Sequence, residues 1–314
     1  MPEEAHQSKN KPLVSIAIPV YNRAAIIGAS IDSILAQTFR DFELIIVDDG
    51  STDDIQSVVC AYQDDRIRYV RHTENRGLMA ARNTGVLESR GAFFAFQDSD
   101  DTWHPQKLKE EVALLSAMPL SVGGAYSRVE KTYINGTTVL IPSDDQKLVG
   151  GDLLEVFLRG DYFITLQALL VRRECIDRVG MFDESFKVFG DGDFIIRFAK
   201  HFKFVYNPNI RVSLKVQNDS ISLDQKKRLA AKERLFEKEQ KTYSRFPAIY
   251  AANAFSLGRT FAFMGDAGKA KIFIWQAVRA RPWRLSYLAF FFLLALGGSH
   301  AVRALGKLSQ KLRR

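Results

Sequence analysis

Three aspartates lie within four residues of one another, at Asp98, Asp100 and Asp101. They follow residues 92–97, a short apolar run with the length and composition of a buried strand. Like charges this close repel one another and cost stability unless a positive group holds them together. Mg²⁺ and Mn²⁺ prefer oxygen ligands and often share them with substrate phosphates. The cluster therefore predicts a Mg²⁺ or Mn²⁺ site. The alternative is a solvated acidic turn that caps a helix beginning at Pro105.

Two further polar segments follow apolar runs nearer the amino terminus. Residues 48–53, Asp-Asp-Gly-Ser-Thr-Asp, come after the apolar run 42–47, and residues 19–22 follow the run 14–18. Ligands in open α/β sheets bind at the carboxyl ends of strands, so both segments are candidate binding loops. The residue types of 48–53 equally suit an ordinary turn with a helix N-cap, and the pattern leaves that alternative open.

The elements that must position these loops alternate between strand and helix through the first half of the chain. This alternation is typical of an α/β protein with a largely parallel sheet. The expected strands are 14–18, 42–47, 67–71 and 92–97. The expected helices are 24–36, 53–62, 78–89 and 105–116.

The second half shows fewer clear signals. Asn135-Gly136 predicts a hairpin turn between strands at 132–134 and 137–141. A buried strand at 166–171 and a helix at 191–200 are expected to follow. The polar segment 215–230 predicts a domain boundary, and the helices expected beyond it are 248–264 and 267–281.

Composition is that of a folded globular protein, with 314 residues, 46% of them hydrophobic and 25% charged. Cys60 and Cys175 have no metal-site spacing and form no disulfide framework. Residues 1–11 are polar, so we expect a disordered segment there rather than a secretory signal. These features predict a cytoplasmic protein.

The basic charge is confined to the last part of the chain. Residues 226–314 contain 19 Lys or Arg and 4 Asp or Glu, a net charge of +15, whereas residues 1–225 carry 25 and 32, a net charge of −7. Residues 285–299 contain no charged side chain, and residues 288–296 are all apolar. This run is short for a membrane span, and its aromatic and basic flanks are typical of an interfacial helix. We therefore expect contact between residues 283–299 and a membrane surface; the alternative is a helix packed within the protein.

Several segments in one order resemble the motifs of family 2 glycosyltransferases. They are residues 14–22, 33–39, 47–53, 75–77, 81–85, 96–101, 180–184 and 190–197. The resemblance covers about residues 12–222. It implies a GT-A (Rossmann-like) fold, an α/β domain with a mostly parallel central sheet and helices on both faces. Residues 223–314 then form a basic, helical C-terminal appendage.

The resemblance also implies roles for individual positions. Pro19 and Tyr21 would line the nucleotide base pocket, and Asp49 would accept hydrogen bonds from a uracil-like edge. Asp98 would bind the ribose, and Asp100 would ligate the Mn²⁺ or Mg²⁺ that bridges the donor diphosphate. The other donor-binding positions are Asn22, Arg76, Arg82 and Ser99.

Asp191 corresponds to the general base of the inverting members of the family. Its alternative role is that of a helix N-cap, since it precedes an apolar helical stretch. The chain departs from the family pattern at two positions. Gly190 stands where many relatives have Glu, and Gln217 stands where many have a His near the metal. Asp98 and Gln217 are further candidate metal ligands.

The predicted protein is an inverting, metal-dependent glycosyltransferase. It moves a sugar from a nucleotide-sugar, with UDP favoured by the resemblance, to a glycan or lipid-linked acceptor at the inner face of the cell membrane. No nucleic-acid partner is expected, because no recognised binding motif accompanies the basic charge. One alternative is a non-catalytic relative that binds nucleotide-sugars. Another is a phosphatase of the haloacid dehalogenase type with Asp98 as nucleophile.

Overall fold

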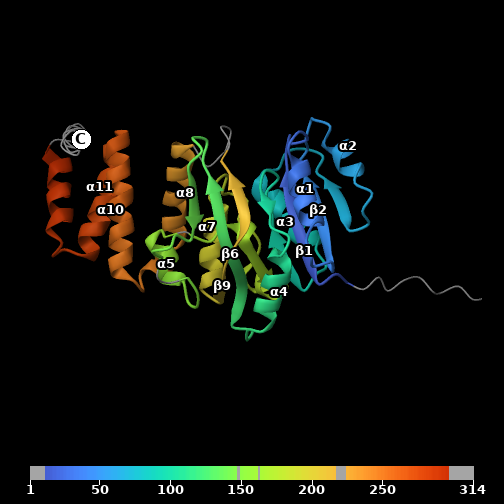
Figure 1. The fold of residues 1–314 in the computed structure, drawn as a ribbon. Coiled ribbons are helices and arrows are strands. Elements are labelled where there is room, and N and C mark those ends of the chain that lie inside the picture. Colours follow the sequence, from blue (N-terminus) through green and yellow to red (C-terminus); the bar gives the residue numbers. More distant parts are fainter. Residues whose placement is uncertain (1–10, 147–148, 162, 217–223, 297–314) are drawn as a thin grey trace, which may run out of the picture. The chain divides into compact units, whose positions relative to one another are not determined.

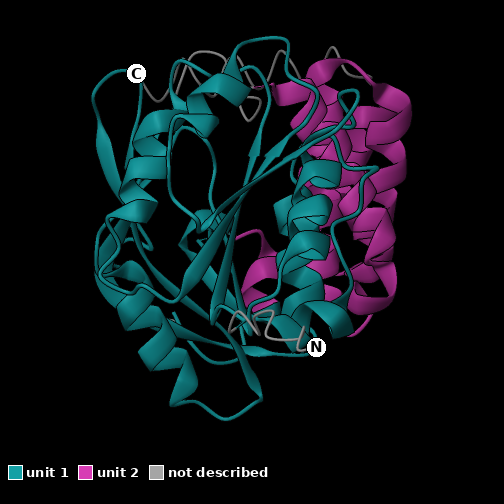
Figure 2. Cartoon of the chain, turned by 90° about the vertical axis from the view of Figure 1, so that its right-hand side faces the viewer, with its two compact units in different colours: residues 1–154, 162–223 teal, residues 155–161, 224–314 magenta. Residues whose placement is uncertain are grey.

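The computed structural model describes residues 11–146, 149–161, 163–216 and 224–296 (Figure 1). Contacts within the chain divide it into two compact units (Figure 2). Unit 1 comprises residues 1–154 and 162–223, and unit 2 comprises residues 155–161 and 224–314. Of the segment 1–11 expected to be disordered, only Lys11 is among the described residues.

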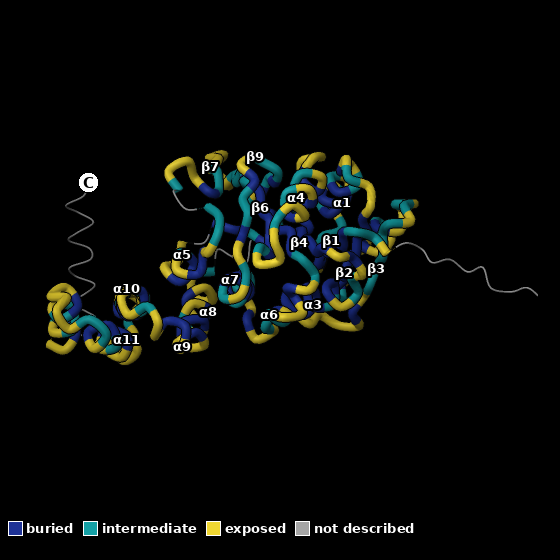
Figure 3. The backbone as a smooth tube through the Cα atoms, turned by 90° about the horizontal axis from the view of Figure 1, so that it is seen from below, coloured by how far each residue is buried: buried dark blue, intermediate teal, exposed yellow. Residues whose placement is uncertain are grey.

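Unit 1 is built on a nine-stranded sheet of order β3-β2-β1-β4-β8-β6-β9-β5, with β7 paired to β6. Its first four strands are parallel neighbours: β1 (Val14–Val20), β2 (Phe42–Asp48), β3 (Ile67–Arg71) and β4 (Phe93–Phe96). Every residue of β1, β2 and β4 is buried, as parallel strands covered on both faces require (Figure 3). Their carboxyl ends bring the three polar segments of the sequence to one edge of the sheet.

Helices cover both faces of this parallel part. They are α1 (Ile27–Leu35), α2 (Ile55–Cys60), α3 (Leu78–Glu88) and α4 (Lys107–Ser116). Leu44 and Ile46 of β2 share a core with α1, whereas Ile45 and Val47 pack with Ala81 of α3. Successive strand residues point to opposite faces, so α3 covers the face opposite α1. A mostly parallel, curled α/β sheet with helices on both faces is therefore confirmed.

The second part of the sheet introduces antiparallel pairs. Its strands are β5 (Thr102–Trp103), β6 (Val122–Thr132), β7 (Thr138–Ile141), β8 (Leu169–Arg172) and β9 (Lys203–Lys215). β8 runs antiparallel to both β4 and β6, and β5 runs antiparallel to β9. β6 and β9 are parallel, with a register shift that passes over Pro208. Because proline has no amide hydrogen to donate, the bulge accommodates it within a long strand.

The remaining helices complete the two units. In unit 1 they include α6 (Arg173–Val179), α7 (Gly190–Ala199) and the 3₁₀ turn η1 (Leu166–Ala168). Helix α5 (Leu154–Arg159) begins at the last residue before the first segment of unit 2. Unit 2 contains α8 (Gln225–Lys238), α9 (Gln240–Tyr243), α10 (Pro247–Met264), α11 (Ala267–Ala280) and a further helix over 285–296. Among the described residues, no helix has both the length and the apolar character that crossing a bilayer demands.

Most expected elements are present, with differences at their ends. Strand 67–71 is confirmed over its full length, and the helices at 78–89 and 248–264 differ from the structure by one residue at one end. The hairpin turn at Asn135-Gly136 is confirmed between β6 and β7. The expected strand 132–134 is wrong beyond its first residue, because β6 ends at Thr132 and the Tyr133 amide donates to the Thr137 carbonyl within the turn. The expected strand 166–171 begins instead as the 3₁₀ turn η1. β5 and the long strand β9 were not expected.

An ion-pair cluster joins α4 to β9 and so holds the second part of the sheet together. Arg211 donates from Nε and Nη2 to the two carboxylate oxygens of Glu110, at 2.8 and 2.5 Å. The side-chain amides of Asn207 and Asn209 donate to the same carboxylate. The hydrogen bond with Arg211 lowers the pKa of Glu110 to about 2.

We predict that Glu110→Gln lowers the free energy of unfolding by about 1–3 kcal/mol, because the charged hydrogen bonds of Arg211 are weakened. The folded pKa lies below the ordinary value near 4, so this stabilisation is present above that pH. It is lost as the pH falls toward about 2. Denaturant unfolding of both proteins between neutral and acid pH measures the difference.

The control for Glu110→Gln is Asp177→Asn, which removes the exposed ion pair of Asp177 with Arg173 on α6. An exposed pair of this kind contributes less than about 1 kcal/mol. If the two variants lose the same stability, or the effect of Glu110→Gln does not shrink at acid pH, the assigned role of this cluster is wrong.

Candidate functional site

The loops after β1 and β2 are fastened to each other by Asn22. Its backbone has a left-handed φ of 53°, a conformation that asparagine tolerates better than most residues. The Asn22 amide donates to Ser51 Oγ at 3.0 Å, and its side-chain oxygen accepts from the Thr52 amide at 2.8 Å. Asn22 was predicted to bind the donor; in the structure its side chain fixes the shape of the loop pair.

Asp49 is buried and holds the segment that precedes α3. Its Oδ1 accepts from the Arg76 amide at 2.9 Å and its Oδ2 from the Gly77 amide at 2.7 Å. His72 Nδ1 lies 2.7 Å from Asp49 Oδ1, and His72 Nε2 lies 2.9 Å from Thr84 Oγ1. The carboxylate therefore reaches across to a neighbouring strand and loop. The sequence left open an ordinary turn with only local contacts, and the contacts of Asp49 with distant residues differ from that alternative.

Asp98 lies at the end of β4 between two partners from distant parts of the chain. Arg82 of α3, itself 5% exposed, donates to Asp98 Oδ1 at 3.1 Å. Gln167 of η1 donates to Oδ2 of the same carboxylate. Gln167 is in turn fixed by its carbonyl, which accepts from Trp103 Nε1 at 3.0 Å. The position of the Asp98 carboxylate is thus set from both sides.

Asp101 is the buried member of the acidic cluster. Burial first, and then the neighbouring carboxylates of Asp98 and Asp100, raise the pKa of Asp101 well above its usual range. The Lys215 amide at the end of β9 donates to Asp101 Oδ1 at 3.2 Å, and this bond opposes that shift. Several carboxylates close together with little water repel one another, and a bound divalent cation lowers this electrostatic cost.

The acidic cluster does not cap a helix, which was the alternative left open by the sequence. The short strand β5 follows Asp101 directly, and α4 begins only at Lys107 with Gln106 as its N-cap residue. The side chain of Gln97 also donates to the Asp101 carbonyl at 2.7 Å, which closes the loop on itself. The three aspartates therefore lie in a loop at the edge of the sheet that is held in shape by its own hydrogen bonds.

An aromatic cluster places the start of α7 beside the end of β4. Phe96 of β4 packs edge-on against Phe182 and Phe194, with ring centroids 5.4 and 5.8 Å apart. The rings of Phe182 and Phe194 are stacked at 4.6 Å. Asn83 of α3 donates to the Phe182 carbonyl at 2.9 Å and accepts from its amide at 2.8 Å. The segment leading into α7 is thus fixed to α3 and β4.

Asp191 lies in the first turn of α7 and not at its cap. The N-cap residue is Phe189, with a left-handed φ of 64°, so the alternative role of Asp191 as an N-cap is wrong. Asp191 Oδ1 accepts from the next amide, that of Gly192, at 3.0 Å. A carboxylate in this place lies near the positive end of the helix dipole, which favours its negative charge.

Gly190, one of the departures from the family pattern, has a packing explanation. A Cβ built at this position would lie 2.3 Å from Met79 Sδ on α3. The glycine therefore lets α7 begin in close contact with α3. A larger residue at 190 would require Met79 to move.

The other predicted site residues lie around the same edge of the sheet. Pro19 and Ser99 are buried, whereas Tyr21 is 45% exposed. Arg76 is half-exposed, with its guanidinium 4.0 Å from the Glu184 carboxylate. Gln217, the remaining candidate metal ligand, lies outside the described residues.

Within the described ranges, no three His, Cys, Asp or Glu side chains converge in a geometry that would hold a metal ion. The acidic cluster nevertheless suits a hard cation, because the Asp101 carboxyl is buried against two further carboxylates. Both oxygens of Asp98 are already engaged, by Arg82 and Gln167. The expectation that Asp100 binds the metal ion therefore stays a prediction.

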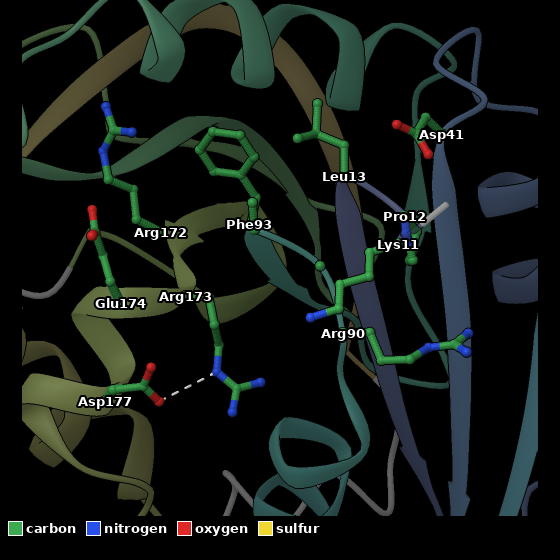
Figure 4. Close-up of a pocket in the computed structure, with 12 residues that line it drawn as sticks. Lys11, Pro12, Leu13, Asp41, Arg90, Phe93, Arg172, Arg173, Glu174 and Asp177 are labelled. Carbon is green, nitrogen blue, oxygen red and sulfur yellow. Dashed lines mark hydrogen bonds and ion pairs between the residues drawn. The ribbon is translucent and has the colours of Figure 1, made fainter. Parts of the chain in front are cut away.

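A cavity of about 570 Å³ lies at the opposite edge of the sheet, near the amino ends of β1 and β4 (Figure 4). The three arginines in its lining are engaged in structural contacts. Arg90 binds Glu43, and Arg172 donates to the carbonyls of Leu115 and Met118. Arg173 donates to the carbonyl of Val86. This cavity has none of the candidate site residues in its lining.

Two residues of the site, His72 and Gln167, were not found from the sequence. They carried no usable signal, because each reaches its carboxylate from a distant part of the chain. Their roles follow only from the pairing of strands and turns in the fold.

The family of this chain follows from a comparison of its sequence with models of known protein families. The model described as "Glycosyl transferase family 2" matches residues 15–170. Through this domain the chain belongs to glycosyltransferase family 2. The matched range contains both polar loops, the acidic cluster and Gln167. Family membership leaves the phosphatase alternative without support.

Relatives from bacteria match only part of the chain. An uncharacterised glycosyltransferase of Rickettsia prowazekii, RP339, is 29% identical over 211 residues, which are 67% of this chain and 66% of that protein. A protein of Escherichia coli, UDP-Glc:alpha-D-GlcNAc-diphosphoundecaprenol beta-1,3-glucosyltransferase WfgD, is 37% identical over 128 residues. That match covers 40% of this chain and 51% of WfgD. The chain thus spans about half to two thirds of the length of these two relatives.

Solved structures share the fold at low sequence identity. S. aureus TarS 1–349 in complex with UDP-GlcNAc superposes with a TM-score of 0.72 at 18% identity, covering 95% of this chain and 91% of that one. A mannosyltransferase of Pyrobaculum calidifontis in complex with GDP-Man and Mn²⁺ gives a TM-score of 0.56 at 20% identity, covering 96% and 89%. Both agree with the GT-A fold.

We predict that Asp49→Asn lowers the free energy of unfolding of the protein without nucleotide by about 1–3 kcal/mol. An amide cannot accept at both of its ends, so one of the bonds from His72, Arg76 and Gly77 loses its acceptor. Denaturant unfolding measures the effect. The control is Asp54→Asn at the exposed start of α2, where the carboxylate makes no capping bond. Unchanged stability in Asp49→Asn would contradict a structural role for this carboxylate.

Proposed function

We propose that this protein is an inverting glycosyltransferase that takes its sugar from a nucleotide-diphosphate-sugar, with UDP as the favoured nucleotide. The observation that carries the proposal is the acidic cluster at the end of β4 in a family 2 domain. There Asp98 is positioned by Arg82 and Gln167 beside a buried Asp101. The UDP-GlcNAc complex of TarS, which shares the fold, supports the choice of nucleotide.

The proposed donor site lies over the loops that follow β1, β2 and β4. The exposed Tyr21 ring and Pro19 are proposed to contact the base, with Asp49 holding the Arg76–Gly77 segment beside it. Asp98, fixed in one position, is proposed to bind the ribose. These roles are consistent with the rule that ligands of α/β sheets bind at the carboxyl ends of strands.

Asp100 is proposed to hold a Mn²⁺ or Mg²⁺ ion together with the donor diphosphate. When bound, such an ion neutralises the negative charge that gathers on the leaving diphosphate. Arg82 and Arg76 are proposed to add positive charge near the same phosphates. The Mn²⁺ complex of the Pyrobaculum mannosyltransferase supports this choice of cofactor by fold alone.

Asp191 is proposed to take the proton from the acceptor hydroxyl. A hydroxyl group is a weak nucleophile, so a carboxylate within hydrogen-bond reach must remove its proton as the new bond forms. The aromatic packing of Phe194 on Phe96 holds the start of α7 beside the acidic cluster and supports this role. Attack opposite the leaving diphosphate would invert the anomeric carbon.

The proposed acceptor is a glycan or a lipid-linked saccharide, and the proposed location is the inner face of the cell membrane. WfgD acts on a diphosphoundecaprenol-linked sugar by its name, and WfaP of E. coli, 33% identical over 122 residues, carries the same description. The net charge of +15 over residues 226–314 suits an anionic lipid surface.

The competing candidate is a family member that binds the donor without turnover. Gly190 and Gln217 motivate it, because both depart from the family pattern. The contact of Gly190 with Met79 accounts for the glycine by packing, so the glycine by itself does not favour this candidate. Donor binding suits both candidates, so only measured transfer or donor hydrolysis distinguishes them.

We predict that UDP binds this protein in the presence of Mn²⁺ and that Asp100→Ala weakens the binding at least about tenfold, since a metal ligand shared with the diphosphate is lost. Calorimetric titration of UDP and GDP, with and without Mn²⁺, measures this. The matched control is Asp54→Ala, an exposed aspartate at the start of α2. The proposal fails if no nucleotide binds under any metal condition.

We also predict that Asp191→Asn lowers the rate of transfer from a UDP-sugar about 10²–10⁴-fold while UDP binding stays within about twofold of the wild type. An amide keeps the shape of the side chain but cannot accept the proton. A UDP-release assay over a panel of UDP-sugars measures the rate. Asp183→Asn, in the segment that leads to α7, is the control. Equal rates in Asp191→Asn and wild type would remove Asp191 from the mechanism.

A further inference from the structure

The helix over residues 285–296, which follows α11 in unit 2, has two apolar faces. Only one of them packs within the protein. Residues 285–296 are helical and contain no charged side chain. On the inner face, Tyr287 stacks on Phe255 of α10 with ring centroids 4.4 Å apart, and Leu294 is fully buried. The face that carries Tyr287 and Leu294 is therefore sufficient to attach this helix to its neighbour.

The other face carries a stripe of exposed apolar side chains. Leu285 is 77% exposed, Phe292 is 59% exposed and Leu296 is 89% exposed. With the exposed Ala289 they follow the spacing i, i+4, i+7, i+11, which places them on one side of a helix. Water-exposed apolar stripes of this kind are typical of interaction surfaces.

Helix α11 extends this apolar surface. Ile272 and Trp275 of α11 are 58% and 48% exposed. The Trp275 ring lies 5.3 Å from that of Phe291, so the two helices are in contact at this place. The connection between them carries Trp283, which is 70% exposed.

Cations accompany the apolar surface, and acidic residues do not. Residues 267–296 contain five Lys or Arg and no Asp or Glu. Arg281 lies over the ring of Trp283 at 5.8 Å, and Arg284 lies over that of Tyr287 at 5.4 Å. In the part of the chain that the structure describes, neither arginine makes an ion pair with a carboxylate. Of these two rings only that of Trp283 is exposed, since Tyr287 is buried against Phe255. An exposed tryptophan beside cations is the pattern of a headgroup-level anchor, in which arginines contact lipid phosphates.

We propose that this surface, formed by the outer sides of α11 and of helix 285–296 with the turn between them, binds an anionic lipid bilayer. Leu285, Phe292 and Leu296 enter the acyl boundary. Trp275 and Trp283 lie at the level of the headgroups, and Arg281 and Arg284 pair with phosphates. A peripheral helix lying in the membrane plane needs only one such face, so the short length of this helix is no obstacle. The inference identifies the surface for the proposed membrane location, but unit 2 carries it without reference to the sugar donor.

The experiment is co-sedimentation of the full-length protein with phosphatidylcholine vesicles that contain or lack phosphatidylglycerol, without nucleotide. Binding is expected on the anionic vesicles. The double variant Phe292→Asn/Leu296→Asn is expected to lose at least about tenfold in affinity, since two apolar side chains no longer leave water. The double variant Arg281→Gln/Arg284→Gln is expected to lose about fivefold per arginine at low salt and less at high salt. The matched control is Leu120→Asn, a leucine of unit 1 that is 65% exposed.

Tryptophan fluorescence gives an independent readout of the same contact. The chain has three tryptophans, and the third, Trp103, is buried in unit 1. Anionic vesicles are expected to shift the emission of the wild type to shorter wavelength and to leave that of Trp275→Phe/Trp283→Phe unchanged. Circular dichroism of each variant checks that the helices remain.

Three results would overturn the inference. One is absence of binding to anionic vesicles, and another is binding that the Phe292→Asn/Leu296→Asn variant retains. The third is a wild-type dimer that this variant converts to a monomer without any vesicle binding, which would make the surface an interface between copies of the chain. None of these results depends on UDP binding or sugar transfer, so failure here is distinguishable from failure of the proposed enzyme activity.

Discussion

Repulsion among the carboxylates at the end of β4 is the constraint around which this domain is arranged. Asp98, Asp100 and Asp101 occupy a single loop, and burial of Asp101 leaves little water to separate their charges. Each neighbouring element contributes a group that offsets this cost. Arg82 comes from α3, Gln167 comes from η1, and the backbone amide of Lys215 comes from the end of β9. A divalent cation bound with a nucleotide diphosphate would further offset the repulsion among these carboxylates. Binding of the ligand would then also stabilise the conformation of the loop.

The surrounding fold fixes these groups from a distance. Asp49 and its partner His72 hold the segment before α3, which places Arg82. Phe182 and Asn83 tie α3 to the segment that leads into α7, which places Asp191. Gly85 brings α3 close to β1, because a Cβ there would lie 2.6 Å from that of Ala17. The donor side and the proposed general base are thus joined by one helix, α3, in which the consecutive residues Arg82 and Asn83 contact different parts of the site.

The sequence predicted the parallel half of the sheet well, because each of its strands is a short apolar run bounded by polar turns. It failed where tertiary contacts override local patterns. β9 contains Pro208, which reads as a break, yet a bulge against β6 lets the strand continue past it. The N-cap position considered for Asp191 is occupied by Phe189 instead, since a left-handed residue begins α7.

The predicted site residues on the described loops lie at one edge of the sheet, but the supporting contacts of His72 and Gln167 depend on long-range pairing that no local signal reveals. In unit 2, the apolar run at 288–296 fitted both a packed helix and an interfacial one. Leu294 is buried whereas Phe292 and Leu296 are exposed, so packing accounts for one side of the helix and membrane contact stays a proposal.

The most direct test of this account is the position of the metal in a crystal grown with UDP and Mn²⁺, located by anomalous diffraction at the manganese edge. We expect a single strong anomalous peak at the carboxylate of Asp100, between the end of β4 and the UDP diphosphate, with Asp98 still hydrogen-bonded to Arg82 and Gln167. A manganese peak away from this loop, or UDP bound at the edge with no metal beside Asp100, would contradict the claim that the acidic cluster is the metal-dependent donor site.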